Sequence, residues 1–211
     1  MGTIKKGILG GFSGKVGTVV GGSWKGISYM RSLPQKVKNP RTAGQVSQRS
    51  KFAITMHYLK PMTALLRTGW KLYAHRQSPI NAAMSYTLAN AIIGTYPDYE
   101  IDPSKVLISR GSLATAVNAN AADMGGSIEI LWDDNSGVSN AKQTDKALMA
   151  IVNPTKGEAV TVTAGEERMT GNQNVAIPAD WSGDEVQAYL GFVSEDSREV
   201  SNSVYLGAIN V

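Results

Sequence analysis

The chain has 211 residues, of which 42% are hydrophobic and 18% charged, a composition typical of a folded globular protein. It contains no cysteine, which excludes disulfide bonds, thiolate metal sites and cysteine nucleophiles. No stretch approaches the roughly 18 apolar residues of a membrane span, and the glycine-rich start lacks the apolar core of a secretion signal. We therefore expect a protein made in the cytoplasm that makes no membrane contact.

The net charge of +4 conceals a strong asymmetry between the two halves of the chain. Residues 1–100 hold 14 of the 21 Lys and Arg residues but only two of the 17 Asp and Glu residues, a balance of +12. Residues 101–211 hold the other 7 basic and 15 acidic residues, a balance of −8. Such asymmetry predicts an acidic partner for the first half, either nucleic acid or the acidic half of another copy.

The first segment, residues 1–31, contains nine glycines separated by short apolar pairs. We predict strands at residues 15–20 and 23–31, joined by a turn at Gly21-Gly22, because glycine adopts positive φ angles without steric cost. A single hairpin is marginally stable in water. This glycine-rich β arm is therefore expected to pair with the rest of its own chain or with a neighbouring subunit.

A helical pair is predicted next, after a basic, proline-containing connector that begins at residue 32. The first helix should start after Thr42 as its N-cap and break near Leu59 and Lys60, ahead of Pro61. Its apolar positions form one helical stripe: Phe52, Met56, Leu59, Met62, Leu66, Trp70 and Tyr73. The second helix should run from Ser78-Pro79 to Gly94, with these core residues: Ile80, Met84, Leu88, Ala91 and Ile92.

The remainder, residues 101–211, follows a linker at residues 96–99 and has the pattern of a β domain. Seven short strands are predicted, at residues 105–109, 127–132, 147–153, 159–164, 174–177, 185–194 and 201–206. Their number and spacing are typical of an immunoglobulin- or fibronectin-like β-sandwich, with Trp132 and Tyr189 as large core residues. The predicted fold class is therefore α+β, in three segments: 1–31, 32–95 and 101–211.

Patterns of catalytic, cofactor-binding or metal-ligating residues are not found in the sequence. Gly14-Lys15 does not fit a phosphate-binding loop, since Leu9 and Val16 occupy two of its required positions. The only histidines, His57 and His75, are spaced wrongly for a metal pair. Residues 133–137, Asp-Asp-Asn-Ser-Gly, resemble the start of a calcium loop, but a tight acidic turn is favoured because position 12 of such a loop would be a threonine. We expect no enzyme, cofactor or metal.

The basic residues around the arm, the connector and the helix start are the best candidates for a functional surface. The predicted contacts are Lys15, Lys25, Arg31, Lys36, Lys38, Arg41, Arg49 and Lys51. They suit contacts with an acidic protein face, in a homo-oligomer or with other particle proteins, or with the phosphates of nucleic acid. Protein contacts are favoured, because no nucleic-acid-binding motif is present and the acidic half would repel phosphate.

Several stretches also resemble a known family. They are Gly-Phe-Ser-Gly-Lys-Val-Gly at 11–17, Trp-Lys-Gly at 24–26, Arg-Ser-Leu-Pro at 31–34, Asn-Pro-Arg-Thr-Ala-Gly-Gln at 39–45, Trp-Asp-Asp-Asn-Ser-Gly at 132–137 and Tyr-Leu-Gly-Phe-Val at 189–193. Together they resemble an uncharacterised family widespread in Bacteroidota and their phages. The family has no assigned activity, so the resemblance transfers no site residues. The segment at 39–49 is similar to segments of phage-like structural proteins, which implies a self-assembling virion component.

Overall fold

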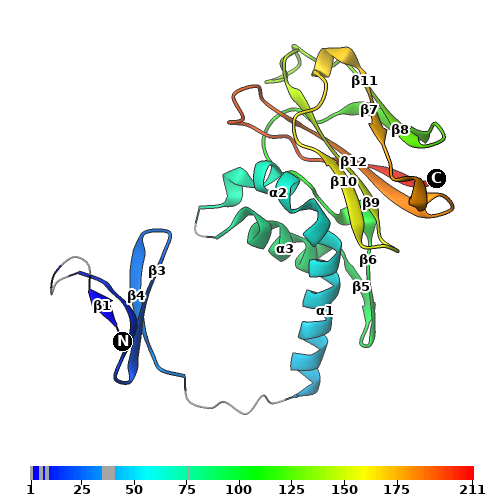
Figure 1. Ribbon diagram of the computed structural model, residues 1–211. Helices are drawn as coiled ribbons and strands as arrows, with labels where there is room; N and C mark the ends of the chain where they lie inside the picture. The colour runs from blue at the N-terminus through cyan, green and yellow to red at the C-terminus, as the bar shows by residue number, and fades with distance from the viewer. Residues whose placement is uncertain (1, 5–6, 8–9, 35–40, 76) are drawn as a thin grey trace. The chain divides into compact units, whose positions relative to one another are not determined.

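The computed structural model describes residues 2–4, 7, 10–34, 41–75 and 77–211. These residues contain three α-helices and 13 β-strands in four antiparallel sheets, so the predicted α+β class is confirmed (Figure 1). The chain divides into two compact units, Met1–Thr42 and Ala43–Val211. The helices, expected as a separate middle segment, thus lie in the same unit as the C-terminal sheets.

The first unit is a four-stranded sheet in which each described strand pairs with the next along the chain (Figure 1). Its strands are β1 Thr3–Ile4, β2 Phe12–Val16, β3 Val19–Trp24 and β4 Ile27–Ser32. The expected glycine-rich β arm is present, but it has more strands than the single predicted hairpin. One outer strand of this sheet is β4, whose six residues are all exposed.

The predicted turn at Gly21-Gly22 is wrong, because both glycines lie inside β3. The chain turns instead at two other dipeptides, which begin at Gly17 and at Lys25. Lys25 and Gly26 both have positive φ, 47° and 81°, as the two central residues of a type I′ hairpin turn do. A lysine in the left-handed region is uncommon, which is why the sequence pattern favoured the glycine pair.

In the second unit, three helices follow the connector: α1 Ala43–Leu59, α2 Thr63–Gly69 and α3 Pro79–Asn90. The predicted break is confirmed, because α1 ends at Leu59 and a 3₁₀ turn, Lys60–Met62, precedes α2. Ser78 caps α3, and its hydroxyl accepts a hydrogen bond of 3.2 Å from the backbone N–H of Asn81. None of the helices in the described part of the chain combines the length and the apolar character needed to cross a membrane.

The predicted apolar stripe packs into the core through its middle but not at its ends. The buried members of the stripe are Leu59, Met62, Leu66 and Trp70. Phe52 and Tyr73 remain 49% and 39% exposed. On α3, the buried positions are Ala82, Ala83, Met84 and Thr87, whereas Ile80 and Leu88 are half-buried. The prediction of core residues was therefore correct for Met84 and for Ala91, which follows α3 and is fully buried, but it missed the buried positions 82, 83 and 87.

The expected linker at residues 96–99 is instead part of a β-hairpin. Its strands are β5 Ile92–Thr95 and β6 Asp98–Ile101, so α3 ends four residues before the predicted Gly94. The β-branched residues after α3 favour an extended chain. The hairpin contacts α1, where the hydroxyls of Tyr99 and Ser47 are 2.7 Å apart and the Lys51 ammonium lies 4.8 Å from the centre of the Tyr99 ring.

Two further sheets complete the second unit. Their strands are β7 Val117–Asp123, β8 Ser127–Asp133, β9 Lys146–Asn153, β10 Glu158–Val162, β11 Asn172–Ala176, β12 Glu185–Val193 and β13 Val204–Asn210. The orders are β11-β8-β7 and β10-β9-β12-β13. Six of the seven predicted strands are confirmed. The predicted strand at residues 105–109 is wrong, because Pro103–Lys105 forms a 3₁₀ turn capped by Asp102 and the four residues after it are not in a strand. The strand that was missed, β7, is rich in Ala and Asn, which have low β propensity.

The helices and the two sheets form three layers, and β9, in the middle layer, packs against both of the others. Alternate residues of β9 enter different cores: Met149 and Ile151 face the β11-β8-β7 sheet, whereas Ala150 and Val152 face the helices. Trp132 packs edge-on against Phe192 in the first of these cores. The burial predicted for Trp132 and Tyr189 is confirmed, at 4% and 0% exposure.

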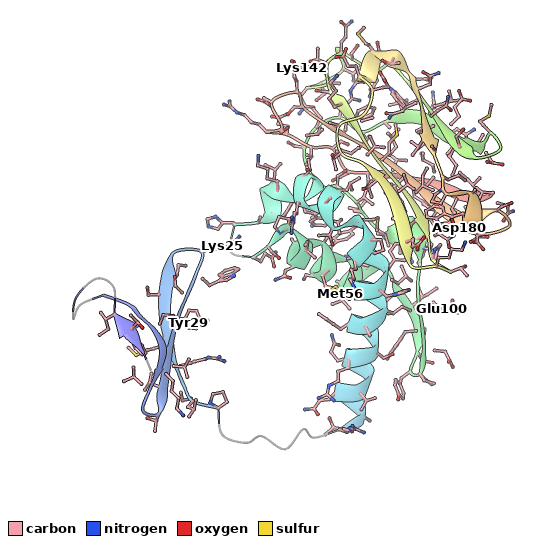
Figure 2. All side chains as sticks on the ribbon, viewed as in Figure 1. Lys25, Tyr29, Met56, Glu100, Lys142 and Asp180 are labelled. Atoms are coloured by element: carbon pink, nitrogen blue, oxygen red, sulfur yellow. The ribbon has the colours of Figure 1, made fainter. Side chains whose placement is uncertain are left out.

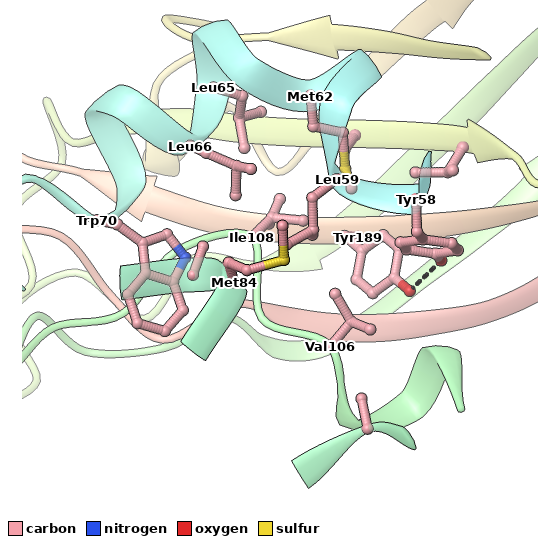
Figure 3. Packing of buried hydrophobic residues seen from close by; sticks show 14 of the residues in the cluster. Tyr58, Leu59, Met62, Leu65, Leu66, Trp70, Met84, Val106, Ile108 and Tyr189 are labelled. Atoms are coloured by element: carbon pink, nitrogen blue, oxygen red, sulfur yellow. Dashed lines mark hydrogen bonds between the residues drawn. The ribbon is translucent and has the colours of Figure 1, made fainter. Parts of the chain in front are cut away.

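Tyrosine hydroxyls connect α1 to the central sheet. The Tyr189 hydroxyl donates to the carbonyl oxygen of Pro103 at 2.9 Å, and the Tyr58 hydroxyl lies 2.7 Å from that of Tyr189 (Figure 3). Around this pair, Figure 3 shows Leu59 of α1 and Met62 of the 3₁₀ turn packed above Ile108 and Val106. Burial raises the pKa of both tyrosines above the ordinary value of 10.0, because the phenolate would lose its hydration.

These raised pKa values predict a loss of stability in alkali. Above a pH of about 10 the unfolded chain releases the two protons while the folded chain keeps them, so the free energy of unfolding falls by up to about 1.4 kcal/mol per pH unit for each group. Tyr58→Phe should remove one such contribution and flatten the fall. Urea unfolding between about pH 8 and pH 11 measures this. The exposed Tyr96→Phe is the control; equal slopes for the two variants would contradict the assignment.

Candidate functional site

The eight basic residues predicted as contacts are divided between the two units, and two of them lie outside the described residues. Lys15, Lys25 and Arg31 lie on the N-terminal sheet, and Arg41 is an exposed residue near the end of the first unit. Arg49 and Lys51 belong to α1 in the second unit. The remaining two, Lys36 and Lys38, lie outside the described residues. The three residues of the N-terminal sheet are therefore the part of the prediction that the structure brings together.

Strand register places Lys15 and Arg31 on the same face of this sheet. Lys15 pairs with Val20, and Val20 pairs with Arg31, so the three form a row across β2, β3 and β4. Side chains of directly paired residues point to the same side of a sheet. Trp24 paired with Ile27, and Tyr29 two residues before Arg31, also point to this side. We call this surface the basic face: Lys15, Val20, Trp24, Ile27, Tyr29 and Arg31.

Aromatic rings accompany the cations on the basic face. Tyr29, labelled in Figure 2, is 50% exposed and stands opposite Gly22. A Cβ atom at Gly22 would lie 2.9 Å from the Tyr29 hydroxyl, so glycine makes room for the ring. At the tip of the sheet the Lys25 ammonium lies 5.2 Å from the centre of the Trp24 ring, a cation–π contact. The surface thus combines positive charge with planar apolar groups.

The opposite face of the sheet is apolar. It carries Ile4 paired with Phe12, Val16 paired with Val19, and Met30. Ile4, Val16 and Met30 are 53%, 52% and 72% exposed. Among the described residues of the first unit, Gly21 is the only buried one, and no apolar side chain is buried. Within the part of the unit that the structure describes, the sheet has no hydrophobic core.

A buried charged cluster in the second unit was missed from the sequence. Arg168 is fully buried, and its Nε donates to Oδ2 of Asp145 at 3.1 Å. Its other nitrogens donate to Asn135 at 2.6 Å and to the carbonyl of Ala114 at 2.9 Å, while the guanidinium lies 3.8 Å from the centre of the Phe192 ring. Burial lowers the pKa of Arg168, and the adjacent Asp145 opposes that shift. No motif surrounds Arg168 in the sequence that could have indicated this role.

Buried ionisable clusters often mark functional sites, but the bonds in this one support a structural role. Arg168 ties together three loops, because its partners precede β7, follow β8 and precede β9. The acidic turn at 133–137 belongs to the same network: the Asp134 carboxylate accepts from the Ser136 N–H at 2.9 Å, and Asn135 donates to the Thr115 carbonyl at 3.0 Å. Within the described ranges, no group of three or more His, Asp or Glu residues is placed to hold a metal ion.

Comparison with protein families gives a match to DUF6266, a family of unknown function, over residues 11–207. The chain belongs to this family. The match confirms the resemblance to an uncharacterised family. The matched residues include β2, β3 and β4 of the N-terminal sheet and nearly all of the second unit. A search of curated proteins found no match. Membership of DUF6266 therefore assigns no activity to either surface.

Loss of one partner of the buried ion pair should destabilise the second unit strongly. Arg168→Met leaves the Asp145 carboxylate buried without its cation, which should lower the free energy of unfolding by about 3–5 kcal/mol in urea titrations. Adding Asp145→Asn to Arg168→Met should restore much of that loss. Arg198→Met, which breaks the exposed pair with Asp196, is the matched control and should cause no measurable change. Equal effects at Arg168 and Arg198 would show that the cluster is not a structural brace.

Proposed function

We propose that this chain is a non-enzymatic structural protein that assembles with further copies of itself, as a component of a virion or phage-like particle. The second unit serves as the rigid body, and the sheet of the first unit binds a neighbour. In this proposal the protein is found in the assembled particle after synthesis in the cytoplasm.

The N-terminal sheet, whose described residues include no buried apolar side chain, carries this proposal. An isolated sheet needs an apolar face packed on something to be stable in water. This sheet exposes apolar side chains on both faces, and a hollow on it is lined by Val19, Met30, Leu33 and Pro34. Large exposed apolar patches mark interaction sites. The eight Lys and Arg residues at positions 1–42, with no Asp or Glu, add charge that an acidic protein surface would neutralise.

Strand order in the second unit supports an immunoglobulin- or fibronectin-like sandwich as its fold. With β7 to β13 taken as strands A, B, C, C′, E, F and G, the two sheets contain A-B-E and C′-C-F-G. This arrangement is the one expected of a fibronectin-like domain. Because such sandwiches serve many functions, the fold supports a rigid scaffold and no particular chemistry.

Nucleic-acid binding is the second candidate, and one observation favours it. The basic face places Trp24 and Tyr29 on the same surface as Lys15 and Arg31. Proteins that bind single strands combine stacking aromatic rings with cations in this way. If this candidate is correct, a fluorescent single-stranded oligonucleotide should bind the full chain with a steep dependence on salt, and Lys15→Glu with Arg31→Glu should abolish that binding.

Deleting residues 2–34 tests the assembly proposal. The second unit has its own two cores, so the truncated chain should remain folded by circular dichroism. Size-exclusion chromatography with light scattering should give a multiple of the chain mass for the intact protein and the mass of one chain for the truncated protein. Full assembly of the truncated chain would rule out the sheet as the binding element, and a monomeric intact chain would rule out self-assembly.

A further inference from the structure

The second unit leaves one sheet face open that has the opposite charge to the basic face. Helices cover the outer side of the β10-β9-β12-β13 sheet, whereas no described element covers the outer side of β11-β8-β7. On β8 the inward residues Ile128 and Ile130 are buried, and the residues between and beyond them point outward: Glu129, Leu131 and Asp133. Leu131 is 41% exposed, which is high for a leucine in the middle strand of a sheet.

Register defines the rest of this surface. Val117 pairs with Asp133, Asn120 pairs with Leu131, and Asn174 pairs with Glu129. We call this surface the acidic face: Val117, Asn120, Glu129, Leu131, Asp133 and Asn174. None of the outward positions of β7, β8 and β11 is Lys or Arg. Asp133 accepts a hydrogen bond of 2.7 Å from the Asn118 side chain, which holds the carboxylate in place at the exposed end of β8.

The two faces carry matching three-residue rows. On the acidic face Glu129, Leu131 and Asp133 follow one another along a single strand, with about 13 Å between the two acids. On the basic face, Lys15, Val20 and Arg31 lie across three strands, with about 10 Å between the two cations. Each row places an apolar side chain between two like charges. The spacing of the two acids exceeds that of the two cations by about 3 Å, which the long, flexible side chains of lysine and arginine can span.

We infer that the basic face of one copy docks on the acidic face of a second copy. The inference rests on the proposed function and identifies the partner surface. Val20 then meets Leu131, and the two cations lie beside Glu129 and Asp133. Since one row runs across its strands and the other along its strand, the two sheets cross at nearly right angles, which is one of the two common modes of sheet packing. Trp24, Ile27 and Tyr29 cover the apolar remainder of the acidic face.

A protein surface explains the basic face better than a nucleic acid does. Ile27 is 66% exposed and lies beside Trp24, and an aliphatic side chain at that position gains from contact with another apolar surface but not from a phosphate backbone. The acidic face supplies both the apolar contact and the opposite charge. Because each copy carries both faces, the contacts close as a reciprocal pair or a ring, or extend as a filament.

Charge reversal in the full chain tests this docking. One variant carries Lys15→Glu and Arg31→Glu, and a second carries Glu129→Lys and Asp133→Lys. Each variant alone sets like charges against each other, so its apparent dissociation constant for assembly should rise at least about tenfold. An equimolar mixture should assemble again, because each variant then meets a complementary face. Light scattering after chromatography, at about 50 mM salt to limit screening, measures both effects.

Matched controls keep the charge changes but move them elsewhere. Lys60→Glu with Arg67→Glu reverses two exposed cations of the helical region, and Asp98→Lys with Glu195→Lys reverses two exposed acids outside the acidic face. Both controls should assemble like the unaltered chain. If they lose assembly equally, net charge and not the two faces governs assembly, and the docking is wrong.

The other possible results of the charge-reversal experiment also test the docking of the two faces. Assembly of the unaltered chain together with normal assembly of both face variants would overturn the docking but leave the proposed function intact. Loss of assembly in both variants without recovery on mixing, with normal circular dichroism, would also overturn it. Lost oligonucleotide binding with unchanged assembly would assign the basic face to nucleic acid. Should a charge-reversed variant fail to fold, Lys15→Gln with Arg31→Gln, and Glu129→Gln with Asp133→Asn, should each still weaken assembly.

Discussion

Coverage of apolar sheet faces is the constraint on which the whole structure depends. The central sheet of the second unit meets it fully, because β9 is buried on both sides between the helices and the β11-β8-β7 sheet. The N-terminal sheet does not meet it within the described residues, since it exposes apolar side chains on both faces. The second unit is therefore stabilised by its own packing, whereas in our proposal the N-terminal sheet is stabilised by a surface of another copy that covers it.

The distribution of charge follows the same division. Cations gather on the N-terminal sheet, whose described residues form no core, and the acidic face lies on the outer side of the β11-β8-β7 sheet. Charge complementarity of this kind mainly speeds association and excludes wrong partners, while apolar contact supplies much of the affinity. A contact in which Val20 packs on Leu131, with oppositely charged side chains paired on either side, would use both effects.

Local sequence signals predicted most of the elements but not their arrangement. The Ser78-Pro79 cap, the break before Pro61 and six of the C-terminal strands follow from hydrogen bonding and periodicity within a few residues. The packing of the helices on the sheet, and the Arg168 cluster, depend on residues far apart in the chain, and no local pattern carries that information. The predicted contact role of Lys15 and Arg31 stays a prediction, and only strand register shows that these two residues share a face with two aromatic rings.

Two errors have a common physical origin. The glycine pair at 21–22 looked like a turn because glycine tolerates positive φ, yet there it makes room for neighbouring side chains, as Gly22 does for Tyr29. The strand β7 was missed because Ala and Asn are poor strand formers, yet it pairs along β8 at the edge of the open sheet. In both places contacts between strands outweighed local preference.

Hydrogen exchange at several protein concentrations tests most directly whether the N-terminal sheet is stabilised by another copy. Amides of β9 provide an internal reference, because they are buried in the second unit at any concentration. Protection of the amides in β2, β3 and β4 should rise with concentration over the range in which the chain assembles. Protection of these strands that is the same in monomer and assembly would contradict the account.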